Sequence, residues 1–273
     1  MKKKLMAVAA CAAALALSVA ALAGCSGGNQ GSSADGAQTL IVGFDQGYPP
    51  YGYVDDNGQF AGFDLDLAQA VADKNGWQLE LTPIDWDAKD ALLGSGAINC
   101  IWNGFTMEGR ENGYTFSEPY MLNEQVVVAK ADSGIDSMED LAGKIVMTQV
   151  DSAALDVLQS EEEGGQAELA ATLKELQTIG DYNNAFMQLE SGAVDAVACD
   201  LSIAAYQMAA KPDVYKQLGS LSSEHYAVGF AKGNQELADQ VTATLKQLDE
   251  EGVVKQLCDK YADQGITYDN WVL

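Results

Sequence analysis

The sequence predicts an α/β fold with two lobes built on one plan. Short apolar runs rich in β-branched and aromatic residues alternate with amphipathic segments, which is typical of sheets covered by helices. Residues 95–101 (SGAINCI) and 191–197 (SGAVDAV) share a pattern, because each follows a predicted helix, turns at Ser-Gly and enters an apolar strand. Such junctions are common in α/β proteins, so coincidence is the alternative to a repeated plan.

The first elements follow from local patterns. Residues 40–44 (LIVGF) predict a buried strand. Residues 53–60 predict a hairpin, because an Asn-Gly pair suits its turn. A helix follows, with Asp64 as its expected cap, and an Asn-Gly pair ends it at residues 75–76. Further strands are expected at residues 79–81, 144–148 and 226–230, and further helices at 87–93, from 151, and in two carboxy-terminal segments separated at Gly252.

The amino terminus indicates export. Three lysines at positions 2–4 precede an alanine-rich apolar run that ends at residues 22–25 (LAGC), which is a secretory signal pattern. A retained membrane-spanning helix is the alternative, since about twenty apolar residues can cross a bilayer. The sequence LAGC resembles the lipoprotein-processing box, which implies that residues 1–24 are removed and that Cys25 is lipidated. Residues 25–38 would then be a flexible tether reaching about 20 Å, at about 5–6 Å × √n.

Composition excludes several classes of function. The chain has 40 Asp and Glu against 15 Lys and Arg, and loss of the signal segment moves the net charge from −25 to −28. Such a surface repels nucleic acids, so no nucleic-acid partner is expected. His225 is the only histidine, and no CxxC motif is present, so no metal site and no cofactor are expected. Cys100, Cys199 and Cys258 are expected to be buried free thiols.

Several motifs in order resemble one family. Residues 62–67 (GFDLDL), followed by Val71-Ala72 and Asn75, resemble the signature of the polar amino-acid family of bacterial extracellular solute-binding proteins, family 3. The resemblance extends over residues 39–264 through further motifs at 42–45 (VGFD), 48–51 (YPPY), 116–120 (FSEPY), 141–144 (LAGK) and 192–200.

The resemblance implies a type II periplasmic-binding-protein-like fold, in which each lobe is a sheet flanked by helices and two crossing strands join the lobes. Lobe 1 would comprise residues 39–122 and 226–273, and lobe 2 would comprise residues 123–225. The crossings are expected near residues 123–127 and 222–227.

A free amino acid is a zwitterion, so its site needs a fixed cation and a fixed anion. Arg110 is the only arginine in the chain, and its planar fork suits a carboxylate. The resemblance assigns Arg110 to the α-carboxylate and Asp200 to the α-ammonium. The alternatives are a surface ion pair for Arg110 and a helix cap for Asp200.

The resemblance also implies contacts around these two charges. Tyr48 and Trp86 would enclose the ligand's side chain, with Asp45 near its far end. Thr106 would add a hydroxyl donor from a loop that includes Asn103 and Gly104. This loop is one residue shorter between Thr106 and Arg110 than the family's usual spacing.

A second set of donors is expected from lobe 2. Ser152 and Ala153 begin a predicted helix, whose amino terminus offers free N–H groups to a carboxylate. The alternative, an ordinary cap by Asp151 or Ser152, is compatible with that role.

Three functional classes remain. The first is a monomeric, lipid-anchored binding protein that delivers an amino acid to the permease and ATPase subunits of an ABC transporter. The second is a sensing module for a separate receptor, and the third is a dehydratase-like enzyme on the same scaffold. The sequence shows no nucleophile–base pair, so we expect a binding protein and not an enzyme.

Overall fold

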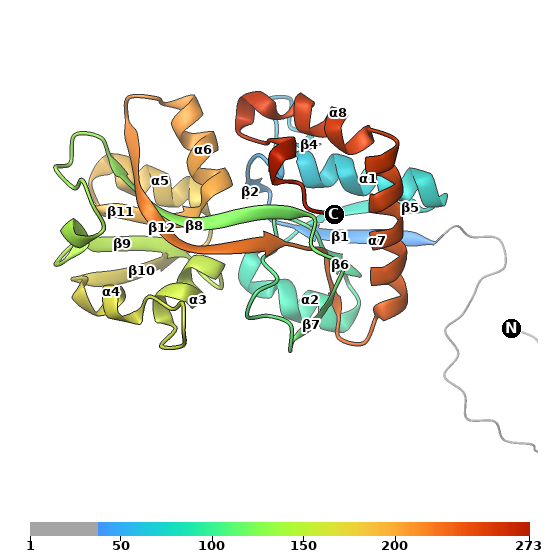
Figure 1. Ribbon diagram of the computed structural model, residues 1–273, viewed down its shortest axis with the longest axis horizontal. Coiled ribbons are helices and arrows are strands. Elements are labelled where there is room, and N and C mark those ends of the chain that lie inside the picture. Colours follow the sequence, from blue (N-terminus) through green and yellow to red (C-terminus); the bar gives the residue numbers. More distant parts are fainter. Residues whose placement is uncertain (1–37) are drawn as a thin grey trace, which may run out of the picture. The chain divides into compact units, whose positions relative to one another are not determined.

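The computed structural model describes residues 38–273 (Figure 1). The predicted signal peptide, the lipidation site Cys25 and all of the tether except Gln38 lie outside the described residues. The described residues form two five-stranded sheets with helices packed on them, and a small three-stranded sheet. The predicted two-lobed α/β fold is therefore confirmed.

The sheet of lobe 1 has the order β5-β1-β6-β13-β7. Strand β1 pairs in parallel with both β5 and β6, whereas β13 runs antiparallel to β6 and β7. Helices α1, α2, α7 and α8 belong to this lobe (Figure 1). The bounds are β1 Thr39–Phe44, β5 Gln78–Pro83, β6 Cys100–Ile101, β7 Tyr114–Phe116, β13 Gly229–Ala231, α1 Phe63–Asn75, α2 Lys89–Ser95, α7 Gln235–Glu250 and α8 Val253–Lys260.

The predicted hairpin is present as part of the small sheet. Strand β3 pairs with β4 and with β2, and the chain turns back at Gly58 with φ 76°. Short 3-10 turns complete lobe 1 near the site and at the carboxy terminus. The bounds are β2 Gly47–Tyr48, β3 Gly52–Val54, β4 Phe60–Ala61, η1 Trp86–Ala88, η3 Ala262–Gln264 and η4 Tyr268–Asn270.

The sheet of lobe 2 has the order β10-β9-β11-β8-β12. Strand β9 pairs in parallel with β10 and β11, and β8 runs antiparallel to β11 and β12. The bounds are β8 Met121–Lys130, β9 Ile145–Gln149, β10 Glu175–Ile179, β11 Ala196–Asp200, β12 Tyr215–Tyr226, α3 Ala153–Gln159, α4 Ala167–Thr172, α5 Tyr182–Ser191, α6 Leu201–Ala210 and η2 Glu139–Leu141.

The repeated motif marks equivalent places in the two lobes. Gly96 ends α2 with φ 76°, and Gly192 ends α5 with φ 77°, so each glycine takes the left-handed conformation that closes its helix. Three residues after each glycine, a polar side chain accepts the N–H of the neighbouring strand. Asn99 accepts from Ile41, and Asp195 accepts from Ile145, both at 2.8 Å. Because these strands are β1 and β9, the two lobes share a local plan beyond the sequence pattern.

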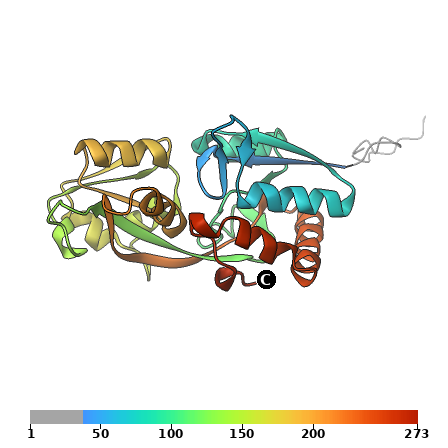
Figure 2. The ribbon, with the colours of Figure 1, turned by 90° about the horizontal axis from the view of Figure 1, so that it is seen from above.

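Strands β8 and β12 connect the lobes as one long antiparallel pair. Their register runs from Met121 opposite Tyr226 to Lys130 opposite Tyr215. Both strands extend across the gap between the two groups of helices (Figures 1 and 2). The predicted lobe boundaries at residues 122/123 and 225/226 fall within this pair of strands and stay a prediction.

Asp64 has a role that the sequence analysis did not predict. Helix α1 begins at Phe63 with Gly62 as its N-cap, so the expectation that Asp64 caps the helix is wrong. Asp64 is fully buried and accepts hydrogen bonds from the N–H of Gly104 at 2.6 Å and from the hydroxyl of Tyr120 at 2.8 Å. Burial raises the pKa of this carboxyl to about 7. The first acid of the GFDLDL motif thus holds the loop at Gly104.

The three cysteines of the described residues are buried free thiols, as the sequence predicted. Cys100 lies in β6, Cys199 in β11 and Cys258 in α8. Burial raises the pKa of the Cys199 thiol well above its usual value. These thiols are therefore part of the apolar core.

We expect Gly62→Ala to destabilise lobe 1 strongly. Gly62 has a φ of +143°, and a Cβ at this position would lie 2.1 Å from the carbonyl oxygen of Tyr51. Strain of this kind costs about 1–3 kcal/mol before any overlap of atoms is counted. The melting temperature, followed by circular dichroism, should fall by about 5–15 °C, taking about 2–4 °C per kcal/mol.

Gly58→Ala is the matched control. Gly58 also has positive φ, at +76°, but beyond its two chain neighbours no atom of the described residues lies within 4 Å of its added Cβ. We expect a fall of only about 2–4 °C. Equal falls for the two variants would contradict the proposed close approach of Gly62 to Tyr51.

Candidate functional site

A small cavity lies between the two lobes and collects most of the predicted site residues. Its volume is about 20 Å³, which is room for about one water molecule. Eight of the ten predicted residues line it, together with Gln149, which the sequence analysis did not predict. The lining residues are Tyr48, Trp86, Gly104, Thr106, Arg110, Gln149, Ser152, Ala153 and Asp200.

Asp200 lies at the carboxyl end of β11, the place where parallel strands present ligand contacts. Its side chain makes no capping hydrogen bond to α6, which argues against the alternative of a helix cap. Instead, Oδ1 accepts from the hydroxyl of Tyr226 at 2.9 Å and from the amides of Asn123 at 3.0 Å and Gln125 at 2.7 Å. Burial raises the pKa of Asp200. The carboxylate is thus held rigidly from one side.

Glu224 is a second buried carboxyl beside Asp200, and the sequence analysis missed it. Its Oε1 accepts from the hydroxyl of Thr106 at 2.7 Å and from the amides of Asn123 and Gln125, both at 2.8 Å. The same two amides therefore bridge Glu224 and Asp200. Burial and the neighbouring Asp200 raise the pKa of Glu224 to about 7.

Arg110 reaches from lobe 1 to lobe 2. Its Nη2 donates to the Asp156 carboxylate at 2.7 Å and to the carbonyl oxygen of Asp151 at 3.2 Å. The guanidinium carbon also lies 5.3 Å from the centre of the Phe105 ring, within the range of a cation–π contact. The alternative of a surface ion pair for Arg110 is therefore present in the structure, with the exposed Asp156 of α3 as its partner, together with the position of the guanidinium in the cavity wall.

Asp151 receives three donors from lobe 1. Its carbonyl oxygen accepts from Trp86 Nε1 at 3.1 Å as well as from Arg110, and its carboxylate accepts from Lys89 Nζ at 3.4 Å. Asp151 has φ 53°, a left-handed conformation that is uncommon outside glycine and asparagine. Lys89 is almost completely buried, and burial lowers its pKa. These contacts hold the lobes together at the edge of the cavity.

Tyr48 and Trp86 form aromatic walls of the cavity from lobe 1. The Tyr48 hydroxyl lies 3.2 Å from that of Tyr226, which connects it to Asp200. The Trp86 ring meets Phe105 edge-on at 5.6 Å, and the Lys89 ammonium lies 5.2 Å from the Trp86 ring centre. Both side chains are buried, so each already packs against protein on one side.

Ser152 and Ala153 form the lobe 2 wall at the start of α3. The Ser152 hydroxyl accepts from the N–H of Leu155 at 3.2 Å, so it serves as the N-cap of this helix. It also lies 3.1 Å from the hydroxyl of Thr148. The capping alternative for Ser152 is therefore present in the structure, together with its position in the cavity wall.

Asp45 and Asn103 are the two predicted site residues that do not line this cavity. Asp45 lines a larger, more open cleft next to it, and its Oδ2 accepts from Gln149 Nε2 of lobe 2 at 2.6 Å. Burial raises the pKa of Asp45. Asn103 is 1 % exposed, and its side-chain amide has no hydrogen-bond partner among the described residues. The Asn103 side chain is therefore buried outside the cavity.

The missed residues carry weak sequence signals. Gln149 ends β9, so the rule that ligand contacts follow parallel strands would have found it. Asn123, Gln125 and Glu224 lie on the predicted crossing strands, where alternate positions face the site. Their roles depend on the register between two strands about a hundred residues apart, and no local pattern encodes that register.

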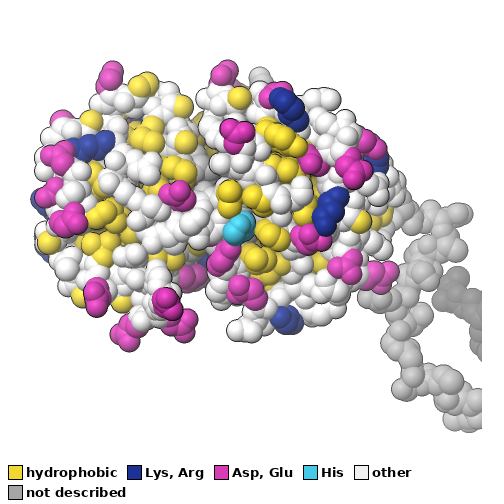
Figure 3. Space-filling model, in the orientation of Figure 1, with side chains coloured by type: hydrophobic (Ala, Val, Ile, Leu, Met, Phe, Trp, Pro, Cys, Tyr) yellow, Lys and Arg dark blue, Asp and Glu magenta, His cyan; other side chains and the backbone are white. Residues whose placement is uncertain are grey.

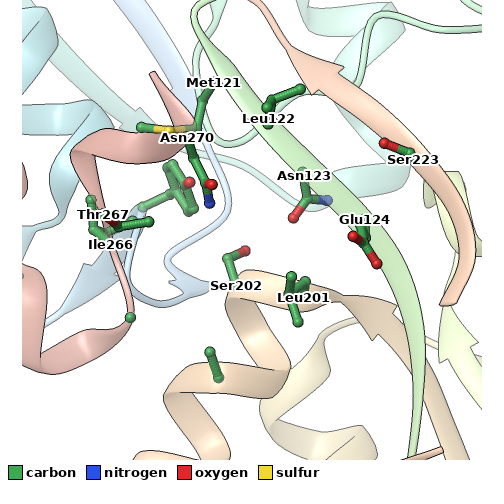
Figure 4. A pocket seen from close by; sticks show the side chains of 13 residues that line it. Met121, Leu122, Asn123, Glu124, Leu201, Ser202, Ser223, Ile266, Thr267 and Asn270 are labelled. Atoms are coloured by element: carbon green, nitrogen blue, oxygen red, sulfur yellow. The ribbon is translucent and has the colours of Figure 1, made fainter. Parts of the chain in front are cut away.

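A second cavity lies beside the crossing strands, outside the predicted site (Figure 4). Residues 121–124 of β8 form one wall, the start of α6 forms another, and the carboxy-terminal turns form a third. Ser202 in this cavity lies 3.3 Å from the hydroxyl of Tyr226, which in turn donates to Asp200. This cavity therefore shares a wall with the network around Asp200.

The fold and the cavity define a class of protein, a two-lobed binding protein whose site is closed between the lobes. The chain belongs to the bacterial extracellular solute-binding proteins, family 3, whose model matches residues 40–264. Members of this family are binding proteins and not enzymes, and the family is extracellular. Within residues 38–273, no helix has both the length and the apolar character needed to cross a bilayer.

Three similar proteins illustrate the family. The L-cystine-binding protein TcyJ of Escherichia coli K12 is 28% identical over 234 residues, covering 84% of each chain. The arginine-binding extracellular protein ArtP of Bacillus subtilis is 28% identical over 247 residues, covering 88% of this chain and 92% of ArtP. A substrate-binding protein of an ABC uptake transporter from Streptococcus pneumoniae, solved with bound histidine, is 31% identical with a TM-score of 0.78, covering 84% of this chain and 94% of that chain.

We expect Asp151→Asn to weaken the closed arrangement moderately. Asparagine tolerates the left-handed conformation and keeps the carbonyl contacts, so the variant removes only the ion pair with Lys89. The Asp151 side chain is 51% exposed, so the loss should be within about 1 kcal/mol, or about two- to fivefold in affinity for a ligand bound between the lobes. Isothermal titration calorimetry measures this change.

Asp132→Asn is the control for that measurement. Asp132 pairs with Lys130 inside lobe 2, at 84% side-chain exposure. Its replacement should leave affinity unchanged. An unchanged affinity for Asp151→Asn as well would show that the Lys89 contact does not stabilise closure.

Proposed function

We propose that this chain is the substrate-binding component of an amino-acid ABC transporter. The observation that carries the proposal is that Arg110 of lobe 1 and Asp200 of lobe 2 line one interlobe cavity. A guanidinium and a carboxylate on opposite walls match the two charged ends of a free amino acid. The ligands of the three relatives, cystine, arginine and histidine, support an amino acid as the substrate class.

The charges around the cavity favour polar or cationic amino acids. Asp200 lines the cavity, Glu224 is bridged to Asp200 by two amides, and Asp45 lines the adjoining cleft. The one arginine of the cavity is already paired with Asp156. The outer face carries many further acids, spread over both lobes without a single cluster (Figure 3). An acidic side chain would add a negative charge to this group, so acidic amino acids should bind weakly.

Binding requires the lobes to separate and close again. The cavity of about 20 Å³ holds about one water molecule, and an amino acid is several times larger. A ligand that contacts both lobes stabilises the closed form by its differential contacts. The closed face would then be recognised by a permease, and a separate ATPase subunit would use ATP. The chain itself would act as a monomer without a cofactor.

Arg110→Ala and Asp200→Asn test this function. Each variant leaves the opposite charge of a bound amino acid without its buried partner, which costs about 2–5 kcal/mol. Calorimetry with the amino acid that gives the largest thermal shift in a screen of the twenty amino acids, ornithine and cystine should show at least about a 30-fold loss of affinity for each variant.

Lys255→Ala and Asp259→Asn are the matched controls. Lys255 and Asp259 form an exposed pair on α8, with side-chain exposures of 59% and 65%. Each control therefore removes a charge of the same sign at a residue that does not line the cavity. Both controls should bind as the unmodified chain does. Wild-type affinity in Arg110→Ala and in Asp200→Asn would exclude the proposed site.

We also propose that Cys25 is lipidated and that residues 25–38 tether the protein to the membrane. The observations that support this are the basic start, the apolar run and the LAGC sequence. Cys25→Ser should move the protein from the membrane pellet to the soluble fraction, and the mature chain should lose its labelling by palmitate. Retention of Cys25→Ser in the membrane pellet would favour an uncleaved anchor.

A further inference from the structure

Two buried carboxyls lie side by side at the crossing strands, and neither has a cation as a hydrogen-bond partner within residues 38–273. Asp200 and Glu224 are 4 % and 3 % exposed. The amides of Asn123 and Gln125 each donate to both carboxyls, at distances of 2.7 to 3.0 Å. In each carboxyl, a single oxygen accepts both of these hydrogen bonds. The two carboxyls therefore face the same two donor amides.

The surrounding groups do not neutralise the pair. From β12, Tyr226 donates its hydroxyl to Asp200, and from β2, Tyr48 contacts Tyr226. Thr106, in the loop after β6, donates to Glu224. The nearest cation of that loop, Arg110, is bound to α3 through Asp156 and Asp151.

His225 does not reach the pair either. This neighbour of Glu224 on β12 is bonded at the surface to Glu108, at 2.7 Å. Two full negative charges that share the same two amide donors in a buried site repel each other strongly. A proton on one of the two carboxyls removes this repulsion.

We propose that Glu224 is a positioning residue of the amino-acid site, which shares one proton with Asp200 and gives it up to solvent when a ligand ammonium reaches Asp200. The proposal rests on the proposed function, because it needs a cationic group at Asp200. Glu224 acts through others: it aligns the amides of Asn123 and Gln125 so that they hold Oδ1 of Asp200. The incoming ammonium replaces the proton as the positive charge, so the net charge of the site is conserved.

The direction of the pH effect follows from this exchange. The bound ammonium favours the ionised pair, so binding lowers the pKa of the pair, and protons are released. Burial and Asp200 hold the pKa of Glu224 at about 7 before that exchange. Affinity should therefore rise as the pH increases from about 5 to 7, and become constant above about pH 8, once the pair has already lost its proton.

The test is calorimetry in two buffers with different enthalpies of ionisation, phosphate and Tris, at pH 7. The probe is the strongest binder among L-arginine, L-glutamine, L-ornithine and L-cystine. About 0.5 proton should be released per bound amino acid in the wild-type chain at pH 7, and affinity should increase about 30-fold from pH 5.5 to pH 8. Binding without proton release would overturn the proposal while leaving the proposed function intact.

The variant Glu224→Gln distinguishes a positioning role of Glu224 from a purely structural one. Glutamine has nearly the same shape, and its Oε1 can accept the same three hydrogen bonds, but it cannot exchange the proton. We expect its proton release to fall to about zero and its affinity to vary less than about threefold from pH 5.5 to 8. An equal loss of affinity at every pH with proton release unchanged would show that Glu224 only supports the fold.

Glu108→Gln is the control for that variant. Glu108 bonds to the backbone N–H and ring of His225, next to Glu224, but its side chain is 41% exposed and lies outside the cavity. Proton release should remain at the wild-type value. If neither these four amino acids nor any other amino acid of the wider screen binds the wild-type chain, the proposed function is excluded. The buffer comparison cannot give this result, because it measures proton release only when an amino acid binds.

Discussion

The antiparallel pairing of β8 with β12 is the constraint on which the rest of the structure depends. These strands are the chain's path between the lobes, and they also carry the polar side chains that hold Asp200. Asn123 and Gln125 come from one strand and Glu224 from the other, and their hydrogen bonds cross between β8, β11 and β12. A change in the angle between the lobes therefore acts on the same residues that define the electrostatics of the site.

Closure in this protein is assembled from contacts that differ in their chemistry. Near the crossing strands, neutral amides and hydroxyls bind two buried carboxyls. At the edge of the cavity, donors of lobe 1 bind the start of α3 through Arg110 and Trp86. The first group is inaccessible to salt, whereas the second includes half-exposed ions that salt screens. The site thus combines a rigid inner wall with an outer edge that responds to solvent.

Much of the fold and part of the site could be predicted from the sequence. The alternation of apolar runs, the Ser-Gly repeats and the family motifs predicted two α/β lobes, because these features are local. The family resemblance identified Arg110 and Asp200, which the structure brings to one cavity. Glu224 and Gln149 were missed, since their positions depend on long-range strand register and not on their neighbours in sequence. Asp64 was misjudged because an aspartate at the start of a helical pattern is typical of an N-cap, whereas the tertiary contact with Gly104 and Tyr120 decides its role.

The left-handed residue at position 151 has an evolutionary consequence. The group that Trp86 and Arg110 bind there is a main-chain oxygen, which every amino acid possesses. A substitution at this position that preserves the backbone conformation can change the strength of the Lys89 contact without losing the other two. Substitutions of Asp151 in relatives could therefore change how readily the lobes separate. The main-chain oxygen that Trp86 and Arg110 bind would be kept.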